Sequence, residues 1–443
     1  MTNGKKETFK AFLYNGLSKL ATYLLILIFA NLYAQQDYGL GNFVLNIRNL
    51  VTIIAFIGLP DALVPLIVRK RDINSSVKLI SLLTLAGFIA GIIIIFFQPW
   101  IWPLVLTFPL TMLSTLSFSF WRAKSKHHIP IRAGFNSMLI IIVFAYLLRS
   151  FGAFGVVASY SLGNLYGFLV LVIPLRKEII KSFSGKFVFK EASSYLKTAL
   201  IAALILNSFL MFTWIVSTIL GLMGTYQQVA QFGVASALAG VISIIPITLS
   251  MFLITRISEI RDKNKSKSIL HRVIRISFFA SLLSSILIIS LIGLIIKIFF
   301  IKYQGIESSV AILILGSIFF SSYYLVYSHF IGKMQVQKAI IPIVTGLILS
   351  IILSILLIPS FGLIGASLSY SISHLIILLI VATKEKIKRI ALISLLSIPL
   401  VYLCYKLSYL GLIVLIALIP LSILFKIITL EDIKVIKKAV LTR

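Results

Sequence analysis

Residues 150–161 read SFGAFGVVASYS, and residues 360–371 read SFGLIGASLSYS. The two segments agree at seven of twelve positions, including two glycines (Gly152 with Gly362, Gly155 with Gly365) and the closing Ser-Tyr-Ser. Glycines that permit tight turns and close helix packing explain part of this match, but they leave the paired Ser-Tyr-Ser unexplained. We interpret the two segments as copies of one internal repeat.

Each copy lies at a joint between apolar runs of membrane-spanning length, for which about 20 residues suffice. The runs fall at 9–33, 38–68, 77–97, 101–121, 134–149, 155–175, 196–221, 227–254, 272–300, 308–331, 339–358, 363–382, 390–407 and 410–427. Six runs separate the copies, so the two halves have the same orientation, as in transporters with parallel repeats. The sequence therefore predicts an all-α polytopic membrane protein with about 14 transmembrane helices. They form two parallel six-helix lobes plus a C-terminal helix pair, unless the last two runs are re-entrant.

The expected domains follow from the joints. They are an N-terminal lobe at 1–175, a cytoplasmic linker at 176–195, a C-terminal lobe at 196–383, and two further helices with a basic tail at 384–443. No joint is long enough for a soluble catalytic domain, and no Walker-type glycine loop is present, which argues against an ATP-driven pump.

Composition and charge agree with this class. Apolar residues make up 60% of the chain and charged residues 12%, which excludes a soluble multi-domain enzyme. The net charge of +29 does not indicate nucleic-acid binding, because the basic residues lie in short joints. They crowd every second joint, which predicts that both termini are cytoplasmic in a multi-pass plasma-membrane protein. Cys404 is the single cysteine, so no disulfide or cysteine metal site forms, and we expect no cofactor or metal.

Two cations lie at depth in the first two runs. Lys19 and Arg48 each lie about ten residues past the first residue of their run, hence about 15 Å into the bilayer. Because cations inside the bilayer are costly, they indicate an anion site, and a phosphate or diphosphate suits a guanidinium and an ammonium. The alternative for Lys19 is snorkelling towards the membrane surface.

Uncharged polar residues accompany the cations at helical spacing. Amides and an aromatic ring suit a sugar, which offers hydroxyls at its edge and an apolar face. The residues that we predict to bind substrate together with Lys19 and Arg48 are Asn15, Asn46, Asn49, Asn207, Trp214 and Gln231. For each amide the alternative is a hydrogen bond between helices, and for Trp214 it is packing. His329 and His374, near or within runs, are expected as packed neutral imidazoles.

Four short motifs carry a family resemblance: YGLG at 38–41, GLPDALV at 58–64, GTY at 224–226 and IPSFGLIGA at 358–366. With them the chain resembles the polysaccharide-transport branch of the multidrug/oligosaccharidyl-lipid/polysaccharide exporter superfamily, which includes Wzx-like O-antigen flippases. The resemblance covers most of the chain, although the motifs are soft apolar patterns.

The resemblance implies a flippase that carries a polyprenyl-(di)phosphate-linked oligosaccharide to the outer leaflet for surface polysaccharide or glycoprotein assembly. It implies two six-helix lobes forming a V around a cavity lined by basic residues, and Lys19 and Arg48 occupy suitable positions. The implied partners are the lipid-linked oligosaccharide and the bilayer, with the chain a monomer and association with polysaccharide-assembly proteins left open. One departure is the absence of the acidic residue that many relatives carry in span seven, where Asn207 and Trp214 stand.

Two alternatives remain. A drug/cation antiporter of the same superfamily would need buried carboxylates, which the runs nearly lack. A membrane-embedded glycosyltransferase or O-antigen polymerase would need a large external region, and the external joints are short. We therefore expect a transporter and not an enzyme.

Overall fold

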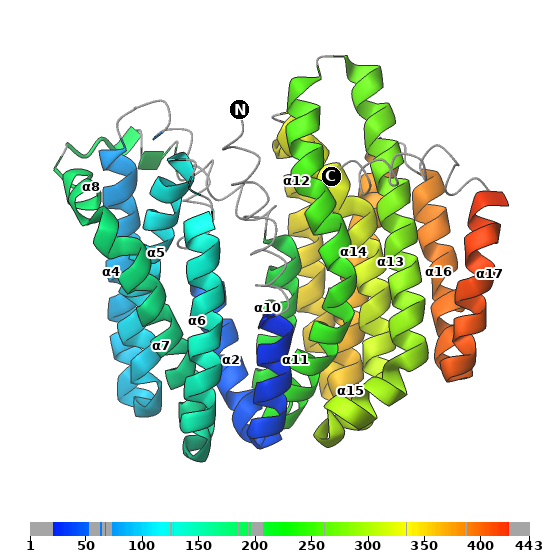
Figure 1. Ribbon diagram of the computed structural model, residues 1–443, viewed down its shortest axis with the longest axis horizontal. Coiled ribbons are helices and arrows are strands. Elements are labelled where there is room, and N and C mark those ends of the chain that lie inside the picture. Colours follow the sequence, from blue (N-terminus) through cyan, green and yellow to red (C-terminus); the bar gives the residue numbers. More distant parts are fainter. Residues whose placement is uncertain are drawn as a thin grey trace. The chain divides into compact units, whose positions relative to one another are not determined.

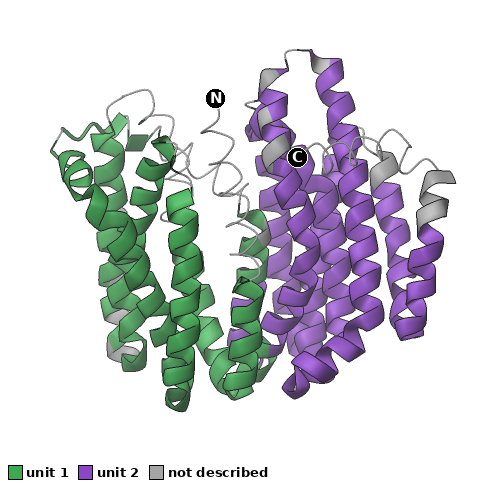
Figure 2. Ribbon diagram, in the orientation of Figure 1, with its two compact units in different colours: residues 1–214, 225–230 green, residues 215–224, 231–443 purple. Residues whose placement is uncertain are grey.

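A computed structural model describes residues 21–52, 63, 67, 73–124, 126, 128–184, 186–190, 192–193, 195, 207–260, 262–333, 335–385 and 388–424. In these ranges the chain forms helices joined by short turns (Figure 1), which confirms the predicted all-helical class. The chain divides into two compact units, residues 1–214 with 225–230 and residues 215–224 with 231–443 (Figure 2). The predicted lobe boundaries stay a prediction.

The first unit is built around α7, Gly152–Val172, which packs against α2, α5 and α6. Close packing is possible because small residues on α7, such as Ala153, Gly155 and Ala158, are buried. The other helices of the unit are α2 (Gln35–Thr52), α4 (Asn74–Phe97), α5 (Trp102–Ala123), α6 (His128–Leu147) and α8 (Arg176–Lys181). Three 3-10 turns accompany them: η2 (Pro99–Ile101), η3 (Arg149–Phe151) and η4 (Ile173–Leu175).

The second unit is built around α14, Glu307–Gly332, which packs against α12, α13, α15 and α16. Its other helices are α12 (Ile244–Glu259), α13 (Lys263–Phe299), α15 (Gln337–Glu385), α16 (Lys388–Leu407) and α17 (Gly411–Leu424). The 3-10 turns are η5 (Val241–Ser243), η6 (Ile301–Tyr303) and η7 (Ser408–Leu410). Helices α10 (Ser208–Met223) and α11 (Tyr226–Gly240) each contribute residues to both units.

Among the described residues, 8 helices are long and apolar enough to cross a membrane, so the expected number of 14 is not confirmed. Two expected spans differ in shape. The run 227–254 is divided by η5 into α11 and α12, and Pro246 at the start of α12 has no N–H to donate to the carbonyl of Ile242. The runs 339–358 and 363–382 are continuous in α15 except for a break at Gly362.

The two copies of the repeat have the same backbone geometry at their turns. Gly152 has φ 54° and ψ −135°, and Gly362 has φ 51° and ψ −123°, a region that essentially only glycine adopts. One pair of repeated serines also corresponds, since Ser159 Oγ donates to the Gly155 carbonyl at 2.6 Å and Ser369 Oγ donates to the Gly365 carbonyl at 2.8 Å. The closing pair differs, because Ser161 Oγ donates to the Val157 carbonyl of its own helix and Ser371 Oγ donates to the Ile312 carbonyl of α14. The repeat in the sequence is thus a repeat in the structure.

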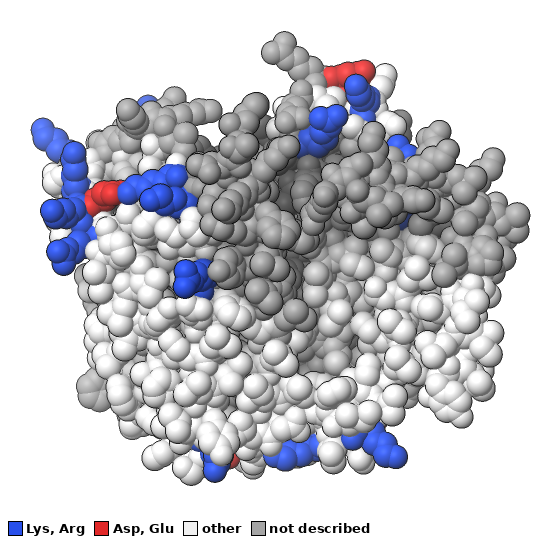
Figure 3. Space-filling model, viewed as in Figure 1, with Lys and Arg blue, Asp and Glu red and all other residues white. Residues whose placement is uncertain are grey.

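On the face that Figure 3 shows, most Lys and Arg side chains of the described residues lie near the upper and lower edges, and few charged side chains lie between. Lys or Arg stands in the last turn of several helices, for example Arg122 in α5, Arg256 in α12 and Lys297 in α13. An apolar middle between charged ends is the pattern of helices that cross a bilayer.

Candidate functional site

Helix α2 carries Arg48, and two glycines of this helix pack closely against its neighbours in the first unit. A Cβ on Gly39 would lie 1.7 Å from the backbone oxygen of Tyr226, and one on Gly41 would lie 2.6 Å from a methyl group of Val156. The YGLG and GTY motifs therefore pack directly against each other. The rings of Phe43 and Tyr226, 5.6 Å apart between centroids, extend this contact.

Arg48 lies in the last two turns of α2, partly buried. Its Nη2 donates to Thr111 Oγ1 of α5 at 2.6 Å, and its Nη1 donates to Asn49 Oδ1 at 3.4 Å. Its Nε is buried and has no hydrogen-bond partner among the described residues. No carboxylate in the described part of the chain pairs with this guanidinium, so it retains the capacity to bind an anion.

The Arg48 side chain lines a cavity of about 280 Å³ inside the first unit, which we call the apolar cavity. Its wall comes from α2, α4 and α5 and is mostly aliphatic or aromatic, with Leu40, Phe43, Val105 and Phe108 as typical members. Gly87 and Gly91 of α4 contribute no side chain, and Gln98, Trp100 and Tyr226 are the other polar or amphipathic members. An apolar wall with one cation suits a ligand that joins an apolar part to an anion.

The other described residues that we predict to bind substrate lie outside the wall of the apolar cavity. Lys19 and Asn15 lie outside the described residues. Asn49 contacts Arg48, whereas Asn46 is buried in α2 and is not part of the apolar cavity's wall. Asn207 precedes α10 and Trp214 lies in its second turn; both are partly buried and neither lines the apolar cavity. Gln231 of α11 belongs to the second unit.

Three other polar residues have structural partners. Gln228 Oε1 accepts from the Thr225 N–H at 3.1 Å, and Thr225 Oγ1 accepts from the Gln228 N–H at 3.2 Å. This reciprocal pair is a capping box at the start of α11. His374, fully buried, bonds the Tyr323 hydroxyl through Nδ1 at 2.6 Å, and His329 bonds Ser266 Oγ through Nε2 at 2.9 Å. Both histidines are packed and hydrogen-bonded, as the sequence predicts.

Comparison with known proteins identifies the fold of the chain. No protein-family model matches the chain. A curated relative, the uncharacterized membrane protein MJ1375 of Methanocaldococcus jannaschii, is 26% identical over 412 residues, covering 85% of this chain and 96% of the relative.

Among solved structures, the lipid II flippase MurJ in an inward closed conformation superposes with a TM-score of 0.71 at 17% identity, covering 94% of this chain and 98% of MurJ. A multidrug resistance MATE family transporter of the MOP superfamily, inward-facing, gives 0.64 at 14% identity, covering 88% of this chain and 99% of that one. An outward-facing conformation of a multidrug resistance MATE family transporter of the MOP superfamily gives a TM-score of 0.62 at 15% identity, covering 90% of this chain and 97% of that one. The chain has the fold of these proteins. At this identity the likeness concerns architecture, so the activity must be argued from the site.

Proposed function

We propose that the protein is a flippase for a polyprenyl-(di)phosphate-linked oligosaccharide. It would move this lipid from the cytoplasmic to the outer leaflet of the plasma membrane by alternating access, with both chain termini in the cytoplasm, for assembly of a surface polysaccharide or glycoprotein. The fold shared with a lipid II flippase supports a transporter of lipid-linked substrates. The observation that carries the proposal is Arg48 on the wall of the apolar cavity.

The chemistry of that wall favours an anionic lipid. A partly buried guanidinium without a carboxylate among the described residues leaves its charge uncompensated, and the phosphate of a ligand would compensate it. The aliphatic wall would accept the first isoprenoid carbons attached to that phosphate. We propose that Lys19 assists Arg48 at the phosphate, and that Asn15, Asn46, Asn49, Asn207, Trp214 and Gln231 contact the sugar chain during transport.

The fold shared with a MATE family transporter makes a drug/cation antiporter the second candidate. That function requires an anionic group to receive a cation, and the described wall of the apolar cavity carries a cation instead. Cationic drugs would be repelled from this wall, so the charge of Arg48 favours the flippase.

The test is flipping by the purified protein in lipid vesicles. The probe is a polyprenyl diphosphate hexose with a fluorescent NBD label, whose outer-leaflet fraction is bleached by dithionite. Because a hydrogen bond to a charged group contributes about 1.5–3 kcal/mol, Arg48→Ala should slow flipping by about ten- to a hundredfold. Lys19→Ala should do the same, while Arg48→Lys and Lys19→Arg should retain part of the rate.

Arg149→Ala is the matched control, because Arg149 is an exposed arginine that stacks on the Tyr146 ring at 4.2 Å, outside the cavity. It should flip the probe at the wild-type rate. Wild-type flipping by both alanine variants would overturn the phosphate site, and efflux of ethidium without flipping of the lipid would favour the antiporter.

A further inference from the structure

A second cavity in the first unit has a different chemistry. It measures about 370 Å³ and lies among α5, α6 and α7; we call it the hydroxyl cavity. The part of its wall that the argument uses comes from α5, with Thr111, Ser114, Thr115 and Arg122, and from α6 and α7, with Ser137 and Asn164. None of the described residues that line it is acidic. Its volume lies in the range of small-molecule sites.

One face of α5 connects the two cavities. Leu104, Phe108, Thr111, Thr115, Phe118 and Arg122 follow one another at alternating spacings of four and three residues, which places them on one side of the helix. Leu104 and Phe108 line the apolar cavity, and the residues from Thr111 onwards line the hydroxyl cavity. The change occurs at Thr111, the residue that accepts the hydrogen bond from Arg48. The order along α5 is thus apolar wall, arginine, hydroxyl wall.

The hydroxyls of this wall are set as acceptors. Thr111, Ser114 and Thr115 donate their hydroxyl protons to carbonyls one turn earlier in α5, at 2.9, 2.8 and 2.7 Å. Their oxygen lone pairs remain available to O–H donors of a ligand. A helix face with several such oxygens matches a polyol, which brings many O–H groups to a small space.

Asn164 of α7 supplies the complementary donor. Its Nδ2 is buried and has no hydrogen-bond partner in the described part of the chain. An amide in this state is costly unless something else receives its protons. Asn164 also lines the hydroxyl cavity, so a rotation of its amide towards the cavity would let a hydroxyl oxygen of a ligand receive them.

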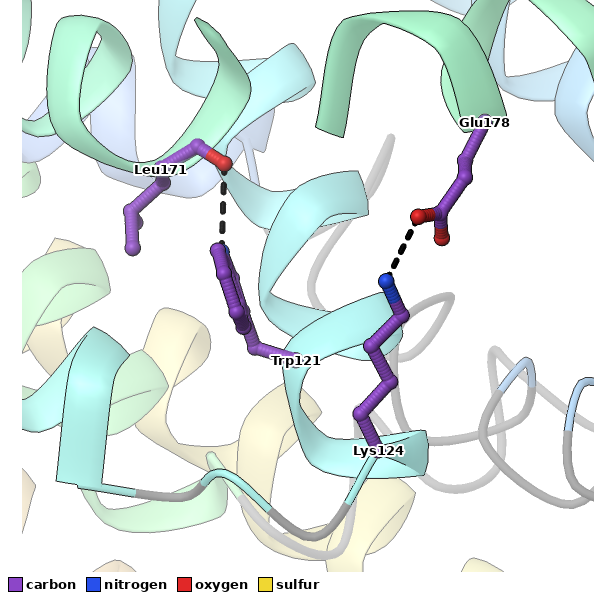
Figure 4. A network of polar contacts seen from close by, with 4 residues as sticks. All are labelled: Trp121, Lys124, Leu171 and Glu178. Carbon is purple, nitrogen blue, oxygen red and sulfur yellow. Dashed lines mark hydrogen bonds and ion pairs between the residues drawn. The ribbon is translucent and has the colours of Figure 1, made fainter. Parts of the chain in front are cut away.

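The far end of the cavity is held in place by contacts between helices, drawn in Figure 4. Trp121 Nε1 of α5 donates to the Leu171 carbonyl of α7 at 3.1 Å, and Lys124 Nζ pairs with a Glu178 carboxylate oxygen of α8 at 2.5 Å. These contacts flank Arg122 in the sequence and fix the end of α5 that carries it. The hydroxyl cavity thus has Arg122 on its wall at this end, while at the other end its Thr111 accepts from Arg48.

We propose that the hydroxyl cavity binds the sugar ring next to the phosphate of the transported lipid. The phosphate lies at Arg48, the first isoprenoid carbons lie in the apolar cavity, and the ring lies against Thr111, Ser114, Thr115 and Asn164. This inference rests on the proposed function and adds where the first sugar is recognised. A hexose fits because its hydroxyls donate to the α5 oxygens and accept from the Asn164 amide.

Two substitutions test the sugar site with little disturbance of the fold. A Cβ at Gly134, which lines the hydroxyl cavity, would meet no atom within 4 Å, so Gly134→Leu fills the cavity without a clash at the backbone. Asn164→Leu removes the unpartnered amide with nearly the same shape, so the variant should be at least as stable as the wild type. Gly293→Leu in α13 is the matched control, because a Cβ there also has no neighbour within 4 Å.

Both variants should flip the NBD-labelled polyprenyl diphosphate hexose about tenfold more slowly than Gly293→Leu, with unchanged unfolding temperatures. In a Cys404→Ala background, glucose 1-phosphate should slow maleimide labelling of a cysteine introduced by Ser137→Cys, and inorganic phosphate should not. Asn164→Leu should abolish this protection.

The outcomes separate the two proposals. If Arg48→Ala blocks flipping while Gly134→Leu and Asn164→Leu flip like the control, the sugar site is wrong and the flippase stands. If glucose 1-phosphate protects the cysteine in an Asn164-dependent manner while the wild-type protein does not flip the lipid probe, the sugar site stands and the flippase is wrong. The sugar site is also wrong if glucose 1-phosphate does not slow the labelling and both variants flip the lipid probe at the normal rate.

Discussion

In the predicted internal repeat, α5 and α14 correspond as the fourth and the tenth spans, yet they use the same kinds of residue differently. In the most apolar window of α14, 83% of residues are buried, against 50% in the α5 region. Polar groups of α14 bond to neighbouring helices: Tyr323 to His374 at 2.6 Å and Ser322 to Ser394 at 2.9 Å. The hydroxyls of α5 bond to their own backbone and face a cavity. The hydroxyls of Tyr323 and Ser322 therefore join α14 to other helices, whereas those of Ser114 and Thr115 in α5 line a space.

The comparison assumes that the two units have the same orientation in the membrane, and labelling tests this with an all-or-none effect. Cysteines introduced in a Cys404→Ala background by Lys126→Cys, after α5, and Gln335→Cys, after α14, should both escape an impermeant maleimide added outside the cell. Arg149→Cys and Lys302→Cys, at the opposite helix ends, should both be labelled. Labelling of one member of the first pair alone would show that the halves are not parallel.

Because α14 is tightly packed, a large-to-small substitution in it should give the largest loss of stability. Tyr323 is fully buried among Phe320, Tyr327 and His374, so Tyr323→Ala should lower the free energy of unfolding by about 3–5 kcal/mol. Phe118→Ala in α5 should cost about 1 kcal/mol, because this ring lines the hydroxyl cavity and is only partly buried. Unfolding of both purified variants in detergent measures the difference, and equal losses would contradict a hollow α5 face.

A smaller loss of stability is expected at the two glycine turns, where the backbone geometry is the same in both units. Gly362→Ala should cost about 1–3 kcal/mol, because alanine is strained at φ 51° and ψ −123°. Gly152→Ala should cost at least as much, since its Cβ would also lie 3.0 Å from the Asp37 carboxylate. Gly293→Ala, in a helix without close neighbours, should be neutral or stabilising by about 1 kcal/mol. If only one of the turn variants lost stability, the geometric repeat would have no energetic counterpart.

The fold was largely predictable, because its signals are local. Apolar runs marked the helices, and Gly152 and Gly362 marked the two turns from the twelve-residue match alone. The break at η5 was not predicted, because hydropathy does not register whether a helix continues through Pro246. The number of spans stays a prediction.

The candidate site was predictable only where a residue was costly enough to stand out. Arg48 was found from its depth, but its partner Thr111 was missed, because hydroxyl residues are common in apolar helices and each bonds its own backbone. The alternating spacing from Leu104 to Arg122 was a signal that could have revealed the α5 face. Conversely, Gln231 of α11 was predicted to bind substrate from its residue type alone, and the nearby Gln228, of the same type, caps the helix.

The length of α13 has a practical consequence for imaging. Its 37 residues extend about 55 Å, while the hydrocarbon core of a bilayer is about 30 Å thick. The length of α13 beyond this thickness remains a helical rod up to its first turn. The Asp262 side chain caps that turn by accepting from the backbone N–H groups of Asn264 and Lys265. A folded soluble protein inserted between α12 and α13 in helical continuity would move with this rod. Such a fusion would give a small membrane protein the recognisable mass outside the bilayer that particle alignment in electron cryomicroscopy requires.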